Sequence, residues 1–204
     1  MPRWMKAALL AASFSLASLV PAVAAGNFGP PPGITLVSGT PGNFLQLKAP
    51  SSKKVRLDPK FMRQVVPYRT EQPAGTIVVN TGEKFLYLVL GKGKALRYGI
   101  GTAKDGFEWS GTHKITRKAE WPGWTPPAEM KQRRPDLPDH MPGGINNPLG
   151  ARALYIGATL YRIHGTNEPW TIGGDVSSGC IRMVNDDVID LYERVKIGAK
   201  VIVL

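Results

Sequence analysis

The sequence predicts a mainly β protein, built as a sandwich or barrel, with one α-helix near its C-terminal end. Short runs rich in β-branched and aromatic residues follow one another from residue 76, separated by turns that contain glycine or proline. Helical periodicity is strong only in residues 185–197. Strands that succeed one another without intervening helices favour a sandwich or barrel over alternating strand–helix units.

The first 25 residues have the pattern of a signal peptide. Arg3 and Lys6 precede an apolar run over residues 7–20, and small residues continue to Ala25, as at a cleavage site. An uncleaved membrane anchor is the alternative, but the run is shorter than the about 20 residues that span a bilayer. We therefore expect an exported protein without an integral membrane span after cleavage.

Three further segments follow the expected signal peptide. Residues 26–54 are rich in proline and glycine, which indicates a flexible linker. Residues 55–74 form a short lead-in segment that can hold a helix or a strand. A turn at residues 72–75 then opens the main domain, residues 75–204, which is long enough to enclose a hydrophobic core.

The first half of the main domain divides into a strand-rich part and a loop-rich part. Residues 76–80, 85–90 and 95–100 are predicted to form an antiparallel meander. Residues 101–150 have few apolar runs but hold three tryptophans and many prolines, which predicts a long ordered loop region near a site. The alternative is an insertion with a small core of its own.

The second half returns to strands and then forms the one strong helix. Residues 153–156 and 160–163 are predicted strands joined by a glycine-containing turn. Asn185 is expected to cap the helix, and Gly198 is expected to end it. Residues 199–204 then form a closing strand.

The chain is strongly basic. Its 26 Lys and Arg against 15 Asp and Glu give a formal net charge of +11, and removal of residues 1–25 lowers this to +9. Export argues against nucleic acid as the partner and favours an anionic polymer or surface outside the cytoplasm, such as the cell wall. Because the basic residues are scattered, the charge can equally serve solubility.

Cys180 is the only cysteine, so the chain has no internal disulfide although its expected compartment is oxidising. A lone thiol retained there indicates a reactive role or deep burial. Three dispersed histidines and one cysteine argue against a structural zinc site. We expect neither a metal nor a cofactor.

The residues around Cys180 suit a nucleophile. Such a site needs a base, a group that orients the base, and N–H groups for the oxyanion. Ser177, Ser178 and Gly179 form a small, flexible lead-in, which lets the N–H groups of residues 178–180 converge. Arg182 can lower the thiol pKa, bind a substrate carboxylate, or form a structural ion pair.

His164 is the candidate base. It leaves a predicted strand sixteen residues before Cys180, and a strand–loop–strand return would bring the two together. A histidine at a strand end is more often a packed or surface residue, so its position alone leaves the role open. His113 and His140 lie in the long loop region and are interpreted as solvated or hydrogen-bonded loop residues.

Two segments resemble the signature of the L,D-transpeptidase catalytic domain family (YkuD-like). That signature is a His-Gly pair, a spacer, then Ser-His-Gly-Cys, an aliphatic residue and Arg or Asn. The matching residues are His164, Gly165, Thr166 and Asn167, followed by Ser177, Ser178, Gly179, Cys180, Ile181, Arg182 and Met183. Similar sequence segments at residues 98–101, 124–127 and 147–155 extend the resemblance over the main domain.

The resemblance implies a β-sandwich in which Cys180 ends a strand within a covered cleft. It implies that Cys180 attacks a peptidoglycan tetrapeptide stem at its third residue, releases D-alanine and forms a thioester, which the amine of another stem resolves. His164 would be the general base, with its ring oriented by the backbone carbonyl of Gly165. The residues implied for oxyanion or substrate binding are Ser177, Ser178, Gly179, Arg182 and Thr166. Carbapenems would acylate the same thiol.

Two departures from the family pattern affect substrate preference. Ser178 stands where many relatives have histidine, and residues 109–113 replace the usual Thr-Pro-x-Gly. The acceptor also stays open. An outer-membrane protein amine would give protein attachment, and water would give an L,D-carboxypeptidase or hydrolase. A catalytically silent wall-binding module is a further alternative, against which the intact Cys, His and Gly set argues.

Overall fold

The computed structural model describes residues 57–204, and these form the mainly β fold that the sequence predicts. The expected signal peptide and linker lie outside the described residues. Nine strands form one continuous sheet in the order β1-β4-β3-β2-β11-β6-β7-β8-β10, and β5 pairs with β9 in a second, two-stranded sheet. The strands are β1 (Gln64–Pro67), β2 (Ile77–Asn80), β3 (Phe85–Gly91), β4 (Lys94–Gly99), β5 (Thr102–Ala103), β6 (Gly111–Glu120), β7 (Arg152–Ile156), β8 (Arg162–His164), β9 (Asp175–Ser177), β10 (Ile181–Arg182) and β11 (Lys200–Val203). The helices are the 3-10 turns η1 (Pro59–Phe61) and η2 (Pro169–Thr171) and the α-helices α1 (Ala128–Arg133) and α2 (Asn185–Arg194).

The first part of the large sheet is the predicted meander of β2, β3 and β4, all antiparallel. Strand β1 from the lead-in segment extends it by pairing with β4, so this segment belongs to the sheet. Strand β11 at the C-terminus pairs in parallel with β2 and antiparallel with β6. The end of the chain thus joins the meander to the second part of the sheet.

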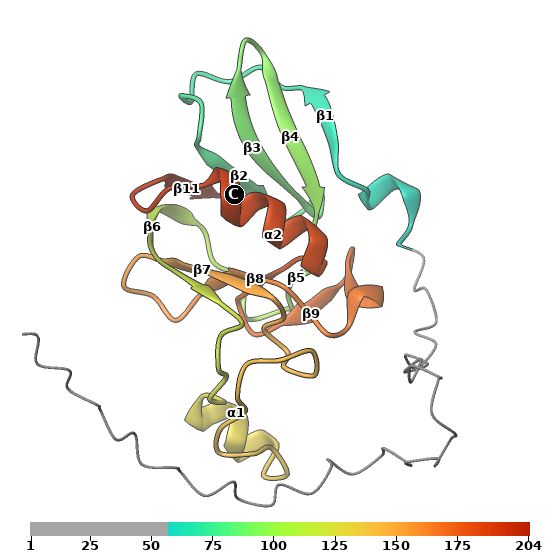
Figure 1. Cartoon of the computed structure of the whole chain (residues 1–204), viewed down its shortest axis with the longest axis vertical. Coiled ribbons are helices and arrows are strands. Elements are labelled where there is room, and N and C mark those ends of the chain that lie inside the picture. Colours follow the sequence, from blue (N-terminus) through green and yellow to red (C-terminus); the bar gives the residue numbers. More distant parts are fainter. Residues whose placement is uncertain (1–56) are drawn as a thin grey trace, which may run out of the picture. The chain divides into compact units, whose positions relative to one another are not determined.

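The second part of the sheet is β6-β7-β8-β10. Strands β6, β7 and β8 are antiparallel neighbours, whereas β8 and β10 run parallel. Helix α2 packs against β7 and β8, and Figure 1 shows it between this part and the β2–β4 meander. Both parts and the helix contribute to the larger of two hydrophobic clusters, and the buried residues of the smaller cluster lie on the meander strands alone. Members of the larger cluster include Ile77, Leu86, Tyr98, Ile115, Leu154, Ile163, Ile181, Met183, Val188 and Leu191.

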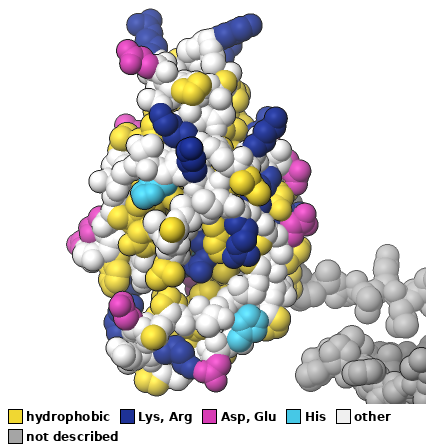
Figure 2. All heavy atoms as spheres, turned by 90° about the vertical axis from the view of Figure 1, so that its left-hand side faces the viewer, with side chains coloured by type: hydrophobic (Ala, Val, Ile, Leu, Met, Phe, Trp, Pro, Cys, Tyr) yellow, Lys and Arg dark blue, Asp and Glu magenta, His cyan; other side chains and the backbone are white. Residues whose placement is uncertain are grey.

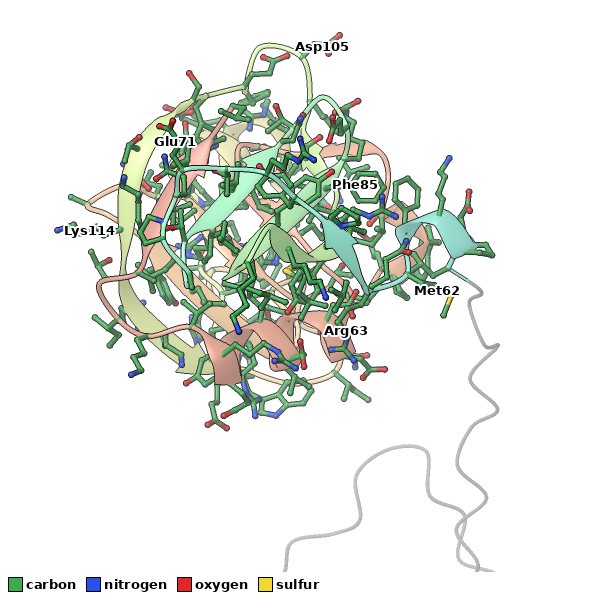
Figure 3. All side chains as sticks on the ribbon, turned by 90° about the horizontal axis from the view of Figure 1, so that it is seen from above. Met62, Arg63, Glu71, Phe85, Asp105 and Lys114 are labelled. Atoms are coloured by element: carbon green, nitrogen blue, oxygen red, sulfur yellow. The ribbon has the colours of Figure 1, made fainter. Side chains whose placement is uncertain are left out.

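An ion pair links the lead-in segment to helix α2. Arg63, which precedes β1, places its Nη1 3.1 Å from the Oδ2 atom of Asp190, and Figure 3 shows Arg63 beside α2. The same carboxylate accepts a hydrogen bond of 2.7 Å from the hydroxyl of the fully buried Tyr98. Burial and this carboxylate raise the pKa of the Tyr98 phenol far above its ordinary value, so Tyr98 stays a donor.

The prediction of a loop throughout residues 101–150 is wrong in one part. Residues 111–120 form β6, the longest strand of the described chain, and loops precede and follow it. Ile115 is the one buried side chain of this strand, and most of the others are polar, charged or exposed. Because one face meets solvent along nearly the whole strand, its apolar alternation is too weak to be recognised.

Charge is spread over the surface that carries β6. Figure 2 shows basic side chains distributed over this face, with acidic ones between them, and no single basic block. This distribution agrees with the scattered charge of the sequence. None of the helices in residues 57–204 is long and apolar enough to cross a membrane.

The expected capping role of Asn185 is also wrong. Val184 is the N-cap of α2, and Asn185 is the first helical residue. Its Oδ1 atom instead accepts hydrogen bonds from the N–H groups of Ala151 (3.0 Å) and Thr166 (3.2 Å). Two glycines make room for this side chain, since a Cβ atom at Gly150 or Gly165 would lie 2.3 or 2.2 Å from Oδ1. Asn185 therefore ties the segments on either side of β7 and β8 to the helix.

We expect Asn185→Ala to lower the free energy of unfolding by about 1–3 kcal/mol, because two partly buried N–H groups lose their acceptor. Urea unfolding followed by circular dichroism measures this change. Asn185→Asp is the matched control, since it keeps an acceptor oxygen and should lose less. An alanine variant as stable as the parent would contradict the structural role of this side chain.

Candidate active site

The parallel pairing of β8 and β10 places Cys180 and His164 on one face of the sheet. Ile181 is opposite Ile163, and both side chains lie in the core. Successive side chains of a strand point to opposite faces, so His164 in β8 and Cys180, just before β10, point to the other face. Cys180 and His164 are diagonal neighbours on adjacent strands, and adjacent strands lie about 4.8 Å apart.

His164 is a buried, neutral imidazole with a fixed tautomer. Its side chain is 4% exposed, and Nδ1 lies 2.5 Å from the backbone oxygen of Gly165. A carbonyl oxygen only accepts, so Nδ1 carries the proton and Nε2 has a free lone pair. Burial, with smaller contributions from the charges of Arg182 and Arg162, lowers the pKa of His164 to about 3, although the hydrogen bond to Gly165 acts in the opposite direction.

Cys180 is a half-buried free thiol. Burial raises its pKa above the ordinary value, because a thiolate is poorly solvated there. The positive charge of Arg162 opposes this increase most strongly, and the charge of Arg182 opposes it to a smaller extent. The resting pair is therefore a neutral thiol beside a neutral imidazole. Such a pair suits removal of the proton during attack more than a preformed thiolate.

Arg162 is a site residue that the sequence analysis missed. It lies two residues before His164 in the same strand and so shares its face, a relation that strand periodicity alone could have revealed. Its guanidinium lies 5.3 Å from the ring centre of Tyr155. Its buried Nε has no hydrogen-bond partner among residues 57–204.

Ser177 organises the loop that carries the thiol. Its hydroxyl donates to the Cys180 carbonyl at 2.6 Å and accepts from the Gly179 N–H at 3.2 Å. Both hydrogen bonds of Ser177 stay within the loop, and Ser177 itself is buried. Ser178 is exposed. The Gly179 N–H, expected to face the oxyanion, is thus engaged. The Cys180 N–H donates to no acceptor within the described residues.

Two aromatic side chains pack against the same loop. Trp109 and Tyr161 stack with ring centres 4.4 Å apart and an angle of 11° between their planes. The indole Nε1 of Trp109 donates to the Gly179 carbonyl at 2.6 Å. Gly179 has a φ of +105°, and a Cβ there would lie 2.2 Å from the Tyr161 ring. Glycine is therefore required at this position.

Arg182 forms the ion pair that was one of its three expected roles. Its Nη1 atom lies 2.9 Å from Glu168 Oε2 and 3.0 Å from Thr171 Oγ1. Thr166 is buried, and its hydroxyl accepts from the Glu168 N–H at 2.9 Å. These contacts shape the segment after His164, and the sequence analysis did not identify Glu168.

The expectation that the other two histidines are loop residues holds for His140 and is wrong for His113. His113 belongs to β6, and its ring centre lies 5.5 Å from that of Trp109 in an edge contact. His140 lies in a loop, with Nδ1 3.0 Å from the Thr125 hydroxyl. Within residues 57–204, no group of three or more His, Cys, Asp or Glu side chains is arranged to hold a metal ion.

Comparison with known proteins gives a consistent result. Residues 74–203 match the family model of the L,D-transpeptidase catalytic domain. The chain is 41% identical over 133 residues to the probable L,D-transpeptidase YbiS of Escherichia coli K12, covering 61% of this chain and 43% of that protein. It is 41% identical over 134 residues to the probable L,D-transpeptidase ErfK/SrfK of the same strain, covering 61% and 42%. It thus spans less than half the length of these two relatives.

Solved structures agree on the fold. An L,D-transpeptidase from Mycobacterium smegmatis superimposes with a TM-score of 0.50 at 18% identity, covering 63% of this chain and 58% of that one. The matching strands and the family match confirm the predicted fold class.

We expect alkylation of Cys180 by iodoacetamide to be slow at pH 7 and to keep rising above pH 9, because the pKa of the half-buried thiol is raised above its ordinary value. The rate is measured by intact-protein mass spectrometry between pH 6 and 10.5. Cys180→Ala is the control, since it removes the only thiol. A rate that levels off below pH 8 would instead indicate a preformed thiolate.

Proposed function

Since this chain belongs to the L,D-transpeptidase catalytic domain family, we propose that it acts on peptidoglycan tetrapeptide stems through a thioester on Cys180. The single observation that carries the residue assignment is the shared face of Cys180 and His164, with Nδ1 of His164 bonded to the Gly165 carbonyl. That bond leaves Nε2 free to take the thiol proton. The acyl group then passes to an amine, which forms a crosslink between stems or attaches a protein.

In the first half-reaction, the thiol proton moves to Nε2 of His164 while Sγ bonds to the carbonyl carbon of the third stem residue. The carbonyl oxygen becomes an oxyanion, and the Cys180 N–H is the donor best able to receive it, because the Gly179 N–H is engaged by Ser177. The tetrahedral intermediate then collapses. Its C–N bond to D-alanine breaks, and the leaving nitrogen takes the proton from His164.

In the second half-reaction, an acceptor amine attacks the thioester carbon. Neutral His164 accepts a proton from that amine, the C–S bond breaks, and the sulfur takes the proton back. The low pKa of His164 suits both transfers, because the imidazole is unprotonated when each attack begins. If water takes the place of the amine, the same steps release a tripeptide stem and the enzyme is an L,D-carboxypeptidase.

The proposal includes an exported protein. The signal peptide pattern of residues 1–25, the linker at residues 26–54 and the scattered positive charge all suit an enzyme that meets an anionic wall polymer in the periplasm. The acceptor is proposed to be another stem peptide or the amine of an outer-membrane protein.

With a disaccharide-tetrapeptide, we expect the protein to gain the mass of the acyl group with loss of D-alanine, and to yield crosslinked dimers. Intact-protein and muropeptide mass spectrometry from the same tubes measure both, with Cys180→Ala as the control. Adduct with tripeptides alone would favour the carboxypeptidase. The same adduct on Cys180→Ala would exclude this nucleophile, and no adduct or product would favour the silent wall-binding module.

His164→Gln should slow thioester formation by about 10²–10⁴-fold, because the thiol proton loses its acceptor. Single-turnover acylation followed by mass spectrometry tests this. Circular dichroism should remain that of the parent, and alkylation at pH 10.5 should proceed, which controls for misfolding. Acylation at the parental rate would remove His164 from the role of base.

A further inference from the structure

We propose that Trp109 is a positioning residue that aims the Cys180 N–H at the oxyanion. Its indole Nε1 donates a hydrogen bond of 2.6 Å to the carbonyl of Gly179, which lies 70 residues later in the sequence. This inference rests on the proposed function, because it concerns the acylation of the same thiol. It adds a residue from the region where this chain departs from the family pattern.

The geometry of one peptide unit carries the argument. The Gly179 carbonyl and the Cys180 N–H belong to the same planar group, and residues 57–204 contain no cis peptide bond. In a trans peptide, the C=O and N–H bonds point in opposite directions. A carbonyl held by Trp109 therefore directs the Cys180 N–H away from the indole, and the direction of the donor depends on the hydrogen bond of Trp109.

The neighbouring groups leave this donor available. Ser177 holds the next carbonyl, that of Cys180, and also engages the preceding N–H, that of Gly179. Loss of the indole bond would leave the Gly179–Cys180 peptide free to rotate. At φ +105°, Gly179 has the conformational freedom that such a rotation requires.

Tyr161 holds the indole in place. It stacks on Trp109 at 4.4 Å, and its ring lies over the position that a Cβ of Gly179 would occupy. Trp109 also makes an edge contact with His113 at 5.5 Å. The indole is thus packed on more than one side, so its N–H has a fixed direction. A phenylalanine at 109 would keep the stacking and lose only the donor.

Two reactions of the same thiol separate this role from a merely structural one. Acylation by imipenem or p-nitrophenyl acetate forms an S–C bond at a carbonyl and passes through an oxyanion. The thiol proton leaves through His164, and the lactam C–N or ester C–O bond breaks. Alkylation by iodoacetamide displaces iodide and forms no oxyanion. Only the first reaction depends on the aim of an N–H group.

The experiment compares Trp109→Phe with the parent chain in both reactions, with Trp121→Phe as the matched control. Loss of a whole oxyanion donor costs about 10²–10³-fold, so a misdirected donor should slow acylation by roughly tenfold or more. Alkylation across pH 6–10.5 should change less than about twofold. Trp121 is an exposed side chain without a role in the site, so Trp121→Phe should acylate at the parental rate.

Other outcomes overturn the inference. Unchanged acylation of Trp109→Phe would show that the indole bond does not aim the donor. An equal fall in acylation and alkylation would assign Trp109 to access or to thiol reactivity. If neither probe acylates the parent chain, the proposed oxyanion site is excluded. Trp109→Phe could lose acylation by these probes but keep alkylation, while the parent chain forms no adduct with a stem peptide. That result would support the inference and contradict the proposed function.

Discussion

The candidate site depends on one constraint, the parallel pairing of two very short strands, β8 and β10. The pairing sets Ile163 against Ile181 in the core, and burial of these two side chains fixes the register. A slip by one residue would place the polar side chains in the apolar core and move the isoleucines to the face that carries the site. The hydrophobic core therefore determines that His164 and Cys180 share the opposite face.

Burial and two arginine charges together set the protonation states of His164 and Cys180 on this face. Burial disfavours both the imidazolium and the thiolate, whereas Arg162 and Arg182 disfavour the imidazolium and favour the thiolate. Both groups stay neutral at rest as a result. Arg162 is the arginine with the larger effect on the thiol, whereas Arg182 forms an ion pair with Glu168.

Side chains hold the backbone on both sides of the site. Ser177 and Trp109 hydrogen-bond to backbone groups of the loop before Cys180, and Tyr161 packs against that loop. Asn185 accepts from the N–H groups of Ala151 and Thr166 and so fixes the segment after His164 to α2. Glycine is needed at three of these positions, because Gly150, Gly165 and Gly179 would each bring a Cβ within 2.4 Å of a neighbouring atom.

The sequence by itself determined the mainly β class and most of the strands, because periodicity is a local property. It also singled out the lone Cys180, whereas the choice of His164 as its partner came from the family resemblance of the motifs around both residues. Only the tertiary structure decided that residues 111–120 form a strand, since Ile115 alone of their side chains is buried. It also decided the partners of Asn185, Arg162 and Trp109. These contacts join segments far apart in the chain, and no local pattern encodes which carbonyl or thiol a distant side chain will meet.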